Sequence, residues 1–228
     1  MAHVGVSGWS FPEWKDTFYA GIPKSRWLEH YSALLSTVEV NYTFRRTMAE
    51  TTAVKWRETV TSGFQFAVKA HQRITHRTRL ADPDGTLPHF VEACRNLGDT
   101  LGPVLFQLPP SFPRDDERLE RFLDGLPSDI SPAFEFRHPS WAVEPVHHLL
   151  EKAGAAWVIA ETDENEPSQI VTAPFTYLRL RKTEYSQAAI RAWAAAIENS
   201  GVESWVYFKH ETTSTDYAQR LAGLLAGA

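Results

Sequence analysis

The stretch FEFRHPSW, residues 134–141, combines the pattern of a hydrophobic strand with two charged side chains. Side chains alternate between the two faces of a strand, so Glu135 and Arg137 share one face while the phenylalanines occupy the other. An ionised group in such a strand is costly unless it is paired, bound to a ligand or solvated. The carboxylate could transfer protons, and the guanidinium could bind an anion. The stretch therefore predicts either a functional site or an internal ion pair.

Other strand-like runs carry polar residues at their carboxyl ends in the same alternation. In α/β barrels this end of the strands forms the mouth where ligands bind. The residues concerned are Glu39, Asn41, Lys69, Gln107, Glu161, Arg179, Arg181 and Lys209. Because seven strands contribute at one predicted level, a ligand site is favoured. The alternative is a network of internal salt bridges, for example between Glu39 and Lys69 and between Glu135 and Arg137.

The residue types at these strand ends predict acid–base chemistry on an anionic, phosphate-bearing substrate. Five cations would neutralise the anion: Lys69, Arg137, Arg179, Arg181 and Lys209. Three groups are candidates for proton transfer: Glu39, Glu135 and His76. Asn41 and Gln107 would orient the substrate, and Trp9 in the long first loop would stack on a base or sugar. The leading interpretation is an enzyme that acts on a small anion.

Two further interpretations use the same residues differently. The basic segment 69–79 lies near an aromatic first loop in the predicted barrel, which is also typical of a protein that binds nucleic acid or processes phosphodiesters. A non-catalytic binding module would instead have a mouth filled by ion pairs. No cofactor is predicted. A divalent metal held by Glu39, Glu135, Glu161 and a histidine, His76 or His138, is a weaker alternative, because many cations share the mouth and no paired-histidine ligand spacing occurs.

Eight short runs rich in apolar, β-branched or aromatic residues must position these groups. They are 3–8, 37–43, 64–70, 103–108, 133–137, 156–161, 175–180 and 204–210. Helical patterns fill most of the gaps, which indicates an α/β fold with parallel strands and right-handed crossovers. We expect a single (β/α)8 barrel of the TIM type over residues 1–228, irregular between strands six and seven. An open doubly wound sheet is the competitor, but no glycine-rich fingerprint follows the first strand.

Composition narrows the setting of this barrel. The chain of 228 residues has a net charge of −5, unlike a strongly basic nucleic-acid binder, although a local basic patch is compatible with that value. A single cysteine excludes an intrachain disulfide. The first residues enter a strand without the features of a signal peptide, and no apolar run is long enough to span a membrane. We expect a cytoplasmic protein; the oligomeric state does not follow from the sequence.

Six motifs resemble, in order, those of the YecE-like family, a domain of unknown function. They are GVSGWSFPEW, VEVNYTF, FAVKAHQRITH, LFQLPPSF, FEFRHPSW and YLRL. The resemblance covers nearly the whole chain and implies a TIM-type α/β barrel, but it implies no activity. The chain departs from the family pattern at Arg181-Lys182, where many members have His-Gly, at Lys209-His210, where many have Asn-Asn, and at Arg45-Arg46 after the second strand. These departures imply a more basic mouth.

Overall fold

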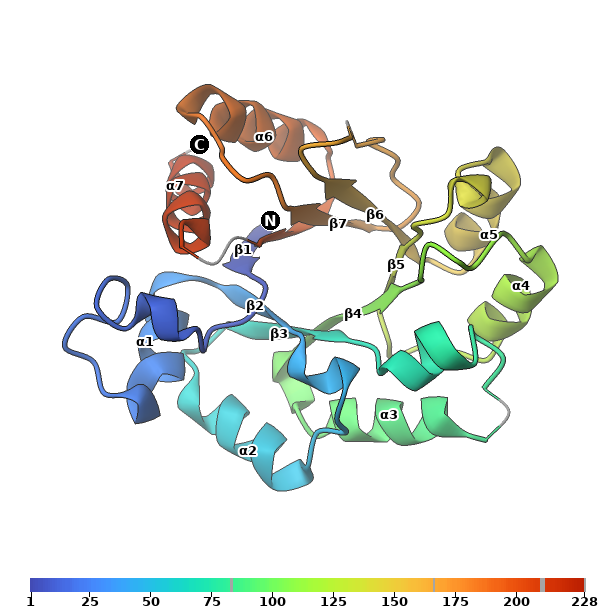
Figure 1. Ribbon diagram of the computed structural model, residues 1–228, viewed down its shortest axis with the longest axis horizontal. Helices are drawn as coiled ribbons and strands as arrows, with labels where there is room; N and C mark the ends of the chain where they lie inside the picture. Colours follow the sequence, from blue (N-terminus) through green and yellow to red (C-terminus); the bar gives the residue numbers. More distant parts are fainter. Residues whose placement is uncertain (83, 166, 210–211, 228) are drawn as a thin grey trace.

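The strands form a closed barrel in which each pairs in parallel with its neighbours in sequence, and β1 pairs with β8 (Figure 1). The structure is a computed structural model that describes residues 1–82, 84–165, 167–209 and 212–227. The strands are β1 (Ala2–Val6), β2 (Thr37–Val40), β3 (Gln65–Lys69), β4 (Leu101–Gln107), β5 (Pro132–Glu135), β6 (Ala156–Glu161), β7 (Phe175–Leu180) and β8 (Glu203–Phe208). The expected eight-stranded TIM-type barrel is confirmed. His210, part of the last departure from the family pattern, lies outside the described residues.

Helices surround the barrel and connect most of its strands (Figure 1). The α-helices are α1 (Trp27–Leu34), α2 (Glu50–Thr59), α3 (Thr86–Arg95), α4 (Asp116–Asp124), α5 (Glu144–Lys152), α6 (Gln187–Asn199) and α7 (Ser214–Ala226). Short helical turns are η1 (Pro12–Trp14), η2 (Lys24–Arg26), η3 (Tyr42–Phe44), η4 (Arg73–Arg77, a π-helical turn), η5 (Gly98–Thr100) and η6 (Pro139–Trp141). Three turns, η3, η4 and η6, follow strand ends and so border the mouth.

The connection between β6 and β7 differs from the others. Its described residues, 162–165 and 167–174, contain no α-helix. Thr172 anchors it, because its hydroxyl donates to the Ala155 carbonyl at 2.6 Å and accepts from the Trp157 amide at 2.8 Å. The irregularity expected between strands six and seven is therefore confirmed for the described part of this segment.

Alternation along the strands separates two hydrophobic clusters. The outer cluster lies between the strands and the helices and includes Phe106 and Phe134, whose rings stack at 5.1 Å. The inner cluster fills the barrel below its mouth and consists of Ala67, Leu105, Ala133, Ala156, Val158, Phe175, Tyr177, Trp205 and Tyr207. Ala133 is in the inner cluster and Phe134 in the outer one, so Glu135 emerges on the inner face, as its position in FEFRHPSW predicts.

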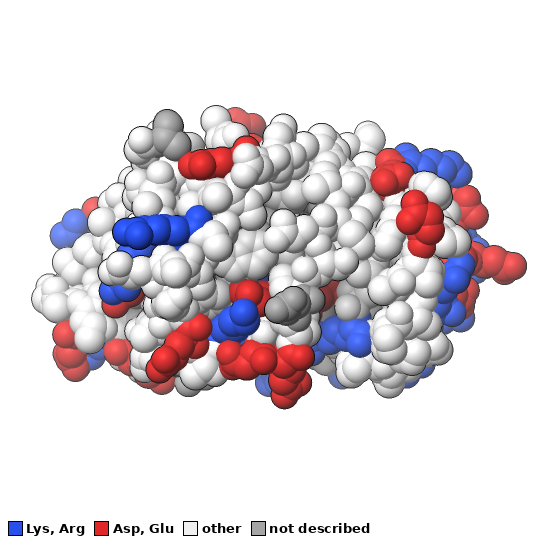
Figure 2. Space-filling model, turned by 90° about the horizontal axis from the view of Figure 1, so that it is seen from above, with Lys and Arg blue, Asp and Glu red and all other residues white. Residues whose placement is uncertain are grey.

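The outer surface mixes charges of both signs. On the face drawn in Figure 2, the Lys and Arg side chains lie among Asp and Glu side chains, without one extended patch of either sign. Among the described residues, no helix combines the length and apolar composition that crossing a bilayer requires.

Candidate functional site

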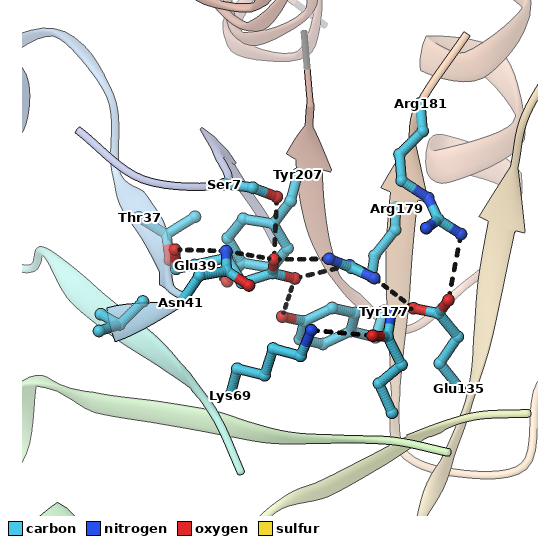
Figure 3. Close-up of polar contacts among 12 residues, drawn as sticks. Ser7, Thr37, Glu39, Asn41, Lys69, Glu135, Tyr177, Arg179, Arg181 and Tyr207 are labelled. Atoms are coloured by element: carbon cyan, nitrogen blue, oxygen red, sulfur yellow. Dashed lines mark hydrogen bonds and ion pairs between the residues drawn. The ribbon is translucent and has the colours of Figure 1, made fainter. Parts of the chain in front are cut away.

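Arg179, near the end of β7, lies between two carboxylates at the mouth of the barrel (Figure 3). Its Nε and Nη2 donate to the two oxygens of Glu39 at 2.8 and 2.9 Å, and its Nη1 donates to Glu135. All three side chains are buried. Burial opposes the charge on Arg179, but the two carboxylates outweigh it and raise its pKa. A permanent cation therefore links β7 to β2 and to β5 across the barrel.

Glu39 has no hydrogen-bonding capacity left for a ligand. Besides Arg179, it accepts from the Ser7 hydroxyl at 2.9 Å, the Asn41 amide at 3.0 Å and the Tyr177 hydroxyl at 2.9 Å. Burial alone would raise the pKa of this carboxyl group, but the charge and hydrogen bonds of Arg179, the Asn41 amide and the charge of Lys69 lower it. Glu39 is thus a fully hydrogen-bonded carboxylate with an exposed fraction of 0%. Asn41, which the sequence predicts to orient a substrate, donates its side-chain amide to this carboxylate.

Glu135 binds four donors at the same level. Gln107 Nε2 at 2.9 Å and Arg179 donate to one oxygen, while Arg137 Nε at 3.0 Å and Arg181 Nη2 at 3.1 Å donate to the other. Burial would raise the pKa of Glu135, but the three guanidinium groups lower it well below its usual range. The expected pair of Glu135 and Arg137 is present as part of this larger set.

Lys69 is connected to Glu135 through an amide. Its Nζ donates to Gln107 Oε1 at 2.8 Å, and Gln107 in turn donates to Glu135. The Lys69 ammonium group also lies 4.3 Å from the centre of the Phe44 ring. Burial, followed by the positive charge of Arg179, lowers the pKa of Lys69 to about 8. The alternative pairing suggested for Lys69, with Glu39, is not found, since Glu39 is bound to Arg179.

These contacts define a mouth cluster, whose members come from five strands or strand ends. The mouth cluster consists of Glu39, Lys69, Gln107, Glu135, Arg137, Arg179 and Arg181. Arg137 is its most accessible cation, with 38% of its side chain exposed. Nε of Arg181 is buried and has no hydrogen-bond partner among the described residues. The cluster therefore presents more positive than negative charge, with a free donor at its edge.

His76 and Lys209 lie next to the mouth cluster. Nδ1 of His76 is 2.9 Å from the Thr75 hydroxyl, and its ring contacts Phe44 edge-on at 5.0 Å. Partial burial, then the charges of Lys69 and Arg137, lower the pKa of His76. Lys209 is exposed, and desolvation followed by the charge of Arg179 lowers its pKa. Both groups thus experience the positive field of the mouth.

Trp9 and Glu161 do not contact the mouth cluster in the described structure. The Trp9 ring packs edge-on against Trp56 of α2 at 4.8 Å, within the outer hydrophobic layer. Glu161 binds Lys182 at 2.7 Å and the Trp193 indole at 3.1 Å. The Trp9 ring therefore packs against side chains of α2 and β3.

Three contributors to the site were not singled out from the sequence in these roles. Ser7 and Tyr177 donate hydrogen bonds to Glu39, and the Phe44 ring lies against the ammonium group of Lys69. Tyr177 has the same parity along β7 as Arg179, so strand alternation could have identified it. Phe44 lies on the short turn η3, where no periodic pattern indicates the direction of its ring.

The sequence left a divalent metal at the barrel mouth as a weaker alternative, and the partners of the mouth carboxylates bear on it. Within the described residues, no group of three or more His, Cys, Asp or Glu side chains is arranged to hold a metal ion. Both buried carboxylates of the mouth cluster are bound to guanidinium groups. His138 Nδ1 contacts the hydroxyl and amide of Ser140 and caps the turn η6.

Comparisons with known proteins agree on one family. The sequence pattern of the family described as "Protein of unknown function DUF72" matches residues 3–228. The UPF0759 protein YecE of Escherichia coli K12 is 32% identical over 142 residues, which are 62% of this chain and 50% of that protein. The match thus spans only half the length of this curated relative.

Two solved structures share the fold. A DUF72 family protein of Thermotoga maritima has a TM-score of 0.87 and 24% identity, with 99% of each chain covered. A DUF72 family protein of Enterococcus faecalis has a TM-score of 0.80 and 18% identity, with 99% of this chain and 98% of that chain covered. At these identities the likeness establishes the fold.

Proposed function

Because the chain belongs to the DUF72 family of proteins of unknown function, its activity has to be sought in its own site, and we propose that the barrel mouth binds a small phosphate-bearing anion and acts on it by acid–base chemistry. One observation carries this proposal. Both carboxylates of the mouth cluster are completely hydrogen-bonded inside the protein, while the cations around them exceed them in number. The unbalanced charge favours an anion as the ligand.

Two guanidinium groups of the mouth cluster define how the anion would be held. Arg137 is bound to Glu135 through Nε, and its side chain is 38% exposed. Arg181 offers the buried Nε that lacks a partner. Guanidinium groups match the geometry of phosphate oxygens and remain charged at all relevant pH values. We therefore assign phosphate binding to these two residues, with Lys209 contributing from the exposed rim.

The proton-transfer roles follow from accessibility. Glu39 and Glu135 have lowered pKa values and no free lone pair, which supports positioning roles: they fix the guanidinium groups. Burial and nearby cations lower the pKa of Lys69 to about 8, and the same causes lower the pKa of His76. A group that exchanges protons near neutral pH is suited to general acid–base work, and Lys69 meets this condition. His76, which contacts the same Phe44 ring as Lys69, is the second proposed acid–base residue because of its position.

Thermal stabilisation by phosphate, sulfate and glycerol 3-phosphate tests anion binding directly. A ligand at 100 times its dissociation constant adds about 2.7 kcal/mol to the free energy of unfolding. In Arg137→Gln, the dissociation constant should rise roughly 10- to 100-fold, because a charge-assisted hydrogen bond is lost. The matched control is Arg220→Gln, which removes the same charge from the exposed side of α7 and should bind like the wild type.

Equal weakening of binding in both variants would mean that the anion responds only to net charge, and the mouth would lose its assignment. A single-stranded oligonucleotide belongs in the same panel. If it bound with a steep salt dependence while small phosphates did not, nucleic acid would become the favoured ligand. Undetectable oligonucleotide binding at low salt would end that alternative.

The buried ion pairs also favour a second candidate, a barrel that binds an anion without transforming it. The network of Arg179 with Glu39 and Glu135 would hold such a binding surface rigid without any proton transfer. This candidate shares the anion-binding prediction with the first. It differs from the first candidate in giving Lys69 no part in a chemical reaction.

A further inference from the structure

Lys69 differs from an ordinary buried lysine in its partner. Its exposed fraction is 8%, and its side chain donates a hydrogen bond to the neutral amide oxygen of Gln107. Buried ammonium groups are normally paired with carboxylates, because an unpaired buried charge is costly. Two carboxylates lie in the same cluster, yet both are bound to guanidinium groups, and no ion pair among the described residues includes Lys69.

The surroundings of Lys69 favour the neutral amine. Burial, Arg179 of β7 and Arg137 after β5 lower its pKa, while Glu39 of β2 and Glu135 of β5 act in the opposite direction. The Phe44 ring beneath the ammonium group also favours the charged form. The net effect brings its pKa to about 8, so an appreciable fraction is neutral at physiological pH. A neutral amine has the free electron pair that a nucleophile requires.

We propose that Lys69 is a nucleophile that forms an imine with a phosphorylated aldehyde or ketone bound at the barrel mouth. This inference rests on the anion site proposed above and names its substrate class. The Nζ electron pair attacks the carbonyl carbon, and a carbon–nitrogen double bond replaces the carbon–oxygen double bond. The carbonyl oxygen leaves as one water molecule with the two protons of the amine, so atoms and charge balance.

The neighbouring side chains suit the two parts of such a substrate. Arg137 and Arg181 would bind the phosphate, since both donate to the same oxygen of Glu135 and are held together by it. Gln107 orients Nζ through one hydrogen bond. The electron pair of the neutral amine stays available for attack on the carbonyl carbon. His76 contacts the same Phe44 ring as Lys69 and would carry a proton to or from the carbonyl oxygen. A phosphate and a carbonyl carbon are thus recognised by different groups.

Reductive trapping tests the imine. The full chain is incubated with dihydroxyacetone phosphate and sodium borohydride, which reduces the imine to a stable secondary amine, and the adduct is located by peptide mass mapping. We expect one adduct per chain, on Lys69, with a labelling rate that rises with pH to half its maximum near pH 8. Glycerol 3-phosphate, which carries the phosphate without a carbonyl, should block the labelling and leave no adduct.

Two variants make the assignment specific. Lys69→Arg keeps a cation in the mouth, cannot form the imine and should lose the adduct. The matched control Lys55→Arg, at an exposed position on α2, should be labelled like the wild type. The wild-type peptide map decides the question even if Lys69→Arg folds poorly.

The outcomes separate this inference from the proposed function. Stabilisation by glycerol 3-phosphate without any adduct on Lys69 would overturn the nucleophile and leave the anion site intact. Adducts spread equally over Lys55 and other surface lysines would also overturn it. Absence of both stabilisation and adduct would overturn the anion site as well.

Discussion

The chemistry of the mouth depends on which residue neutralises which. Arg179 is bound to both buried carboxylates, and Lys69 donates its hydrogen bond to an amide. Arginine suits this central position, because its planar fork binds one carboxylate with two donors and a second with another. The lysine that remains can then change its protonation state near neutral pH. Burial and the charge of this guanidinium therefore lower the pKa of a lysine on another strand.

At the scale of a single residue, Lys69 should impose a pH dependence on stability. Its pKa falls from 10.5 to about 8 on folding, so the unfolded chain binds more protons between these values. The free energy of unfolding must then rise with pH through this window, by up to about 1.4 kcal/mol per pH unit. The destabilisation by the buried charge is present in full below about pH 8 and is lost as the pH rises to 10.5, the pKa of an ordinary lysine.

Lys69→Met should abolish this contribution. Urea unfolding at pH 8 and at pH 10 should show a wild-type stability that gains about 2 kcal/mol over the variant across that interval. Lys55→Met, a substitution at an exposed position of α2, should follow the wild type at both pH values. If Lys69→Met had the same pH dependence as the wild type, Lys69 would not be the group that titrates.

At the scale of elements, the close approach of β1 to β2 depends on a missing side chain. Gly5 lies opposite Thr37, and a Cβ added to Gly5 would lie 1.9 Å from the Thr37 carbonyl oxygen. The Tyr31 hydroxyl fills the remaining space, since it donates to that oxygen and accepts from the Val6 amide, both at 2.9 Å. Any side chain at Gly5 must push the two strands apart.

Gly5→Ala should therefore destabilise the protein by about 3 kcal/mol or more, at the upper end of overpacking effects. Gly223→Ala is the matched control, because Gly223 lies on the exposed side of α7 with nothing within 4 Å of an added Cβ. It should stabilise the protein by up to about 1 kcal/mol through helix propensity. Chemical denaturation of both variants measures the difference. Equal stability of the two would contradict the close approach.

The elements also differ in how far sequence could predict them. The bounds of all eight strands lie within three residues of those of the apolar runs, because a parallel barrel buries both faces of each strand. Helix α2 gave no comparable signal: its sequence ETTAVKWRET is mostly polar, and Ala53 is its one buried residue. Hydrophobic periodicity predicts a helix only where the helix buries a continuous apolar face.

Strand alternation predicted which charged side chains would gather, but not how they would pair. It placed Glu39, Lys69 and Arg179 on the inner face, and the structure brings all three to the mouth. Pairing across a barrel depends on the stagger between strands and on side-chain length, and neither follows from alternation within one strand. The long Arg179 side chain reaches Glu39 from β7, so Lys69 on the adjacent strand β3 does not pair with it.

At the scale of the whole molecule, the mouth cluster connects strands that are distant around the barrel. Glu39 lies on β2, Glu135 on β5 and Arg179 on β7, and none of these strands is adjacent to another of the three. The ladder bonds join neighbours only, whereas these ion pairs cross the interior. Removal of one partner leaves a buried charge uncompensated, which lowers the free energy of unfolding by roughly 3–5 kcal/mol.

Glu39→Gln should lower the free energy of unfolding by about 3 kcal/mol at pH 7, because Arg179 loses one of its two carboxylates. Tyr177→Phe removes one hydrogen bond of the same carboxylate and should cost about 1 kcal/mol. Since folding lowers the pKa of Glu39, its contribution is complete above about pH 4.3 and is lost as pH falls through the lower folded value. The difference in unfolding free energy between wild type and Glu39→Gln, measured by urea unfolding, should therefore narrow in acid.

Salt at about 0.5 M should leave the stability difference between wild type and Glu39→Gln at pH 7 nearly unchanged, because the pair of Glu39 and Arg179 is buried. The same salt should reduce any effect of Asp129→Asn on stability, because the pair of Asp129 with Arg95 is exposed. If this salt abolished the difference in unfolding free energy between wild type and Glu39→Gln, the buried ion pairs would not hold the barrel together.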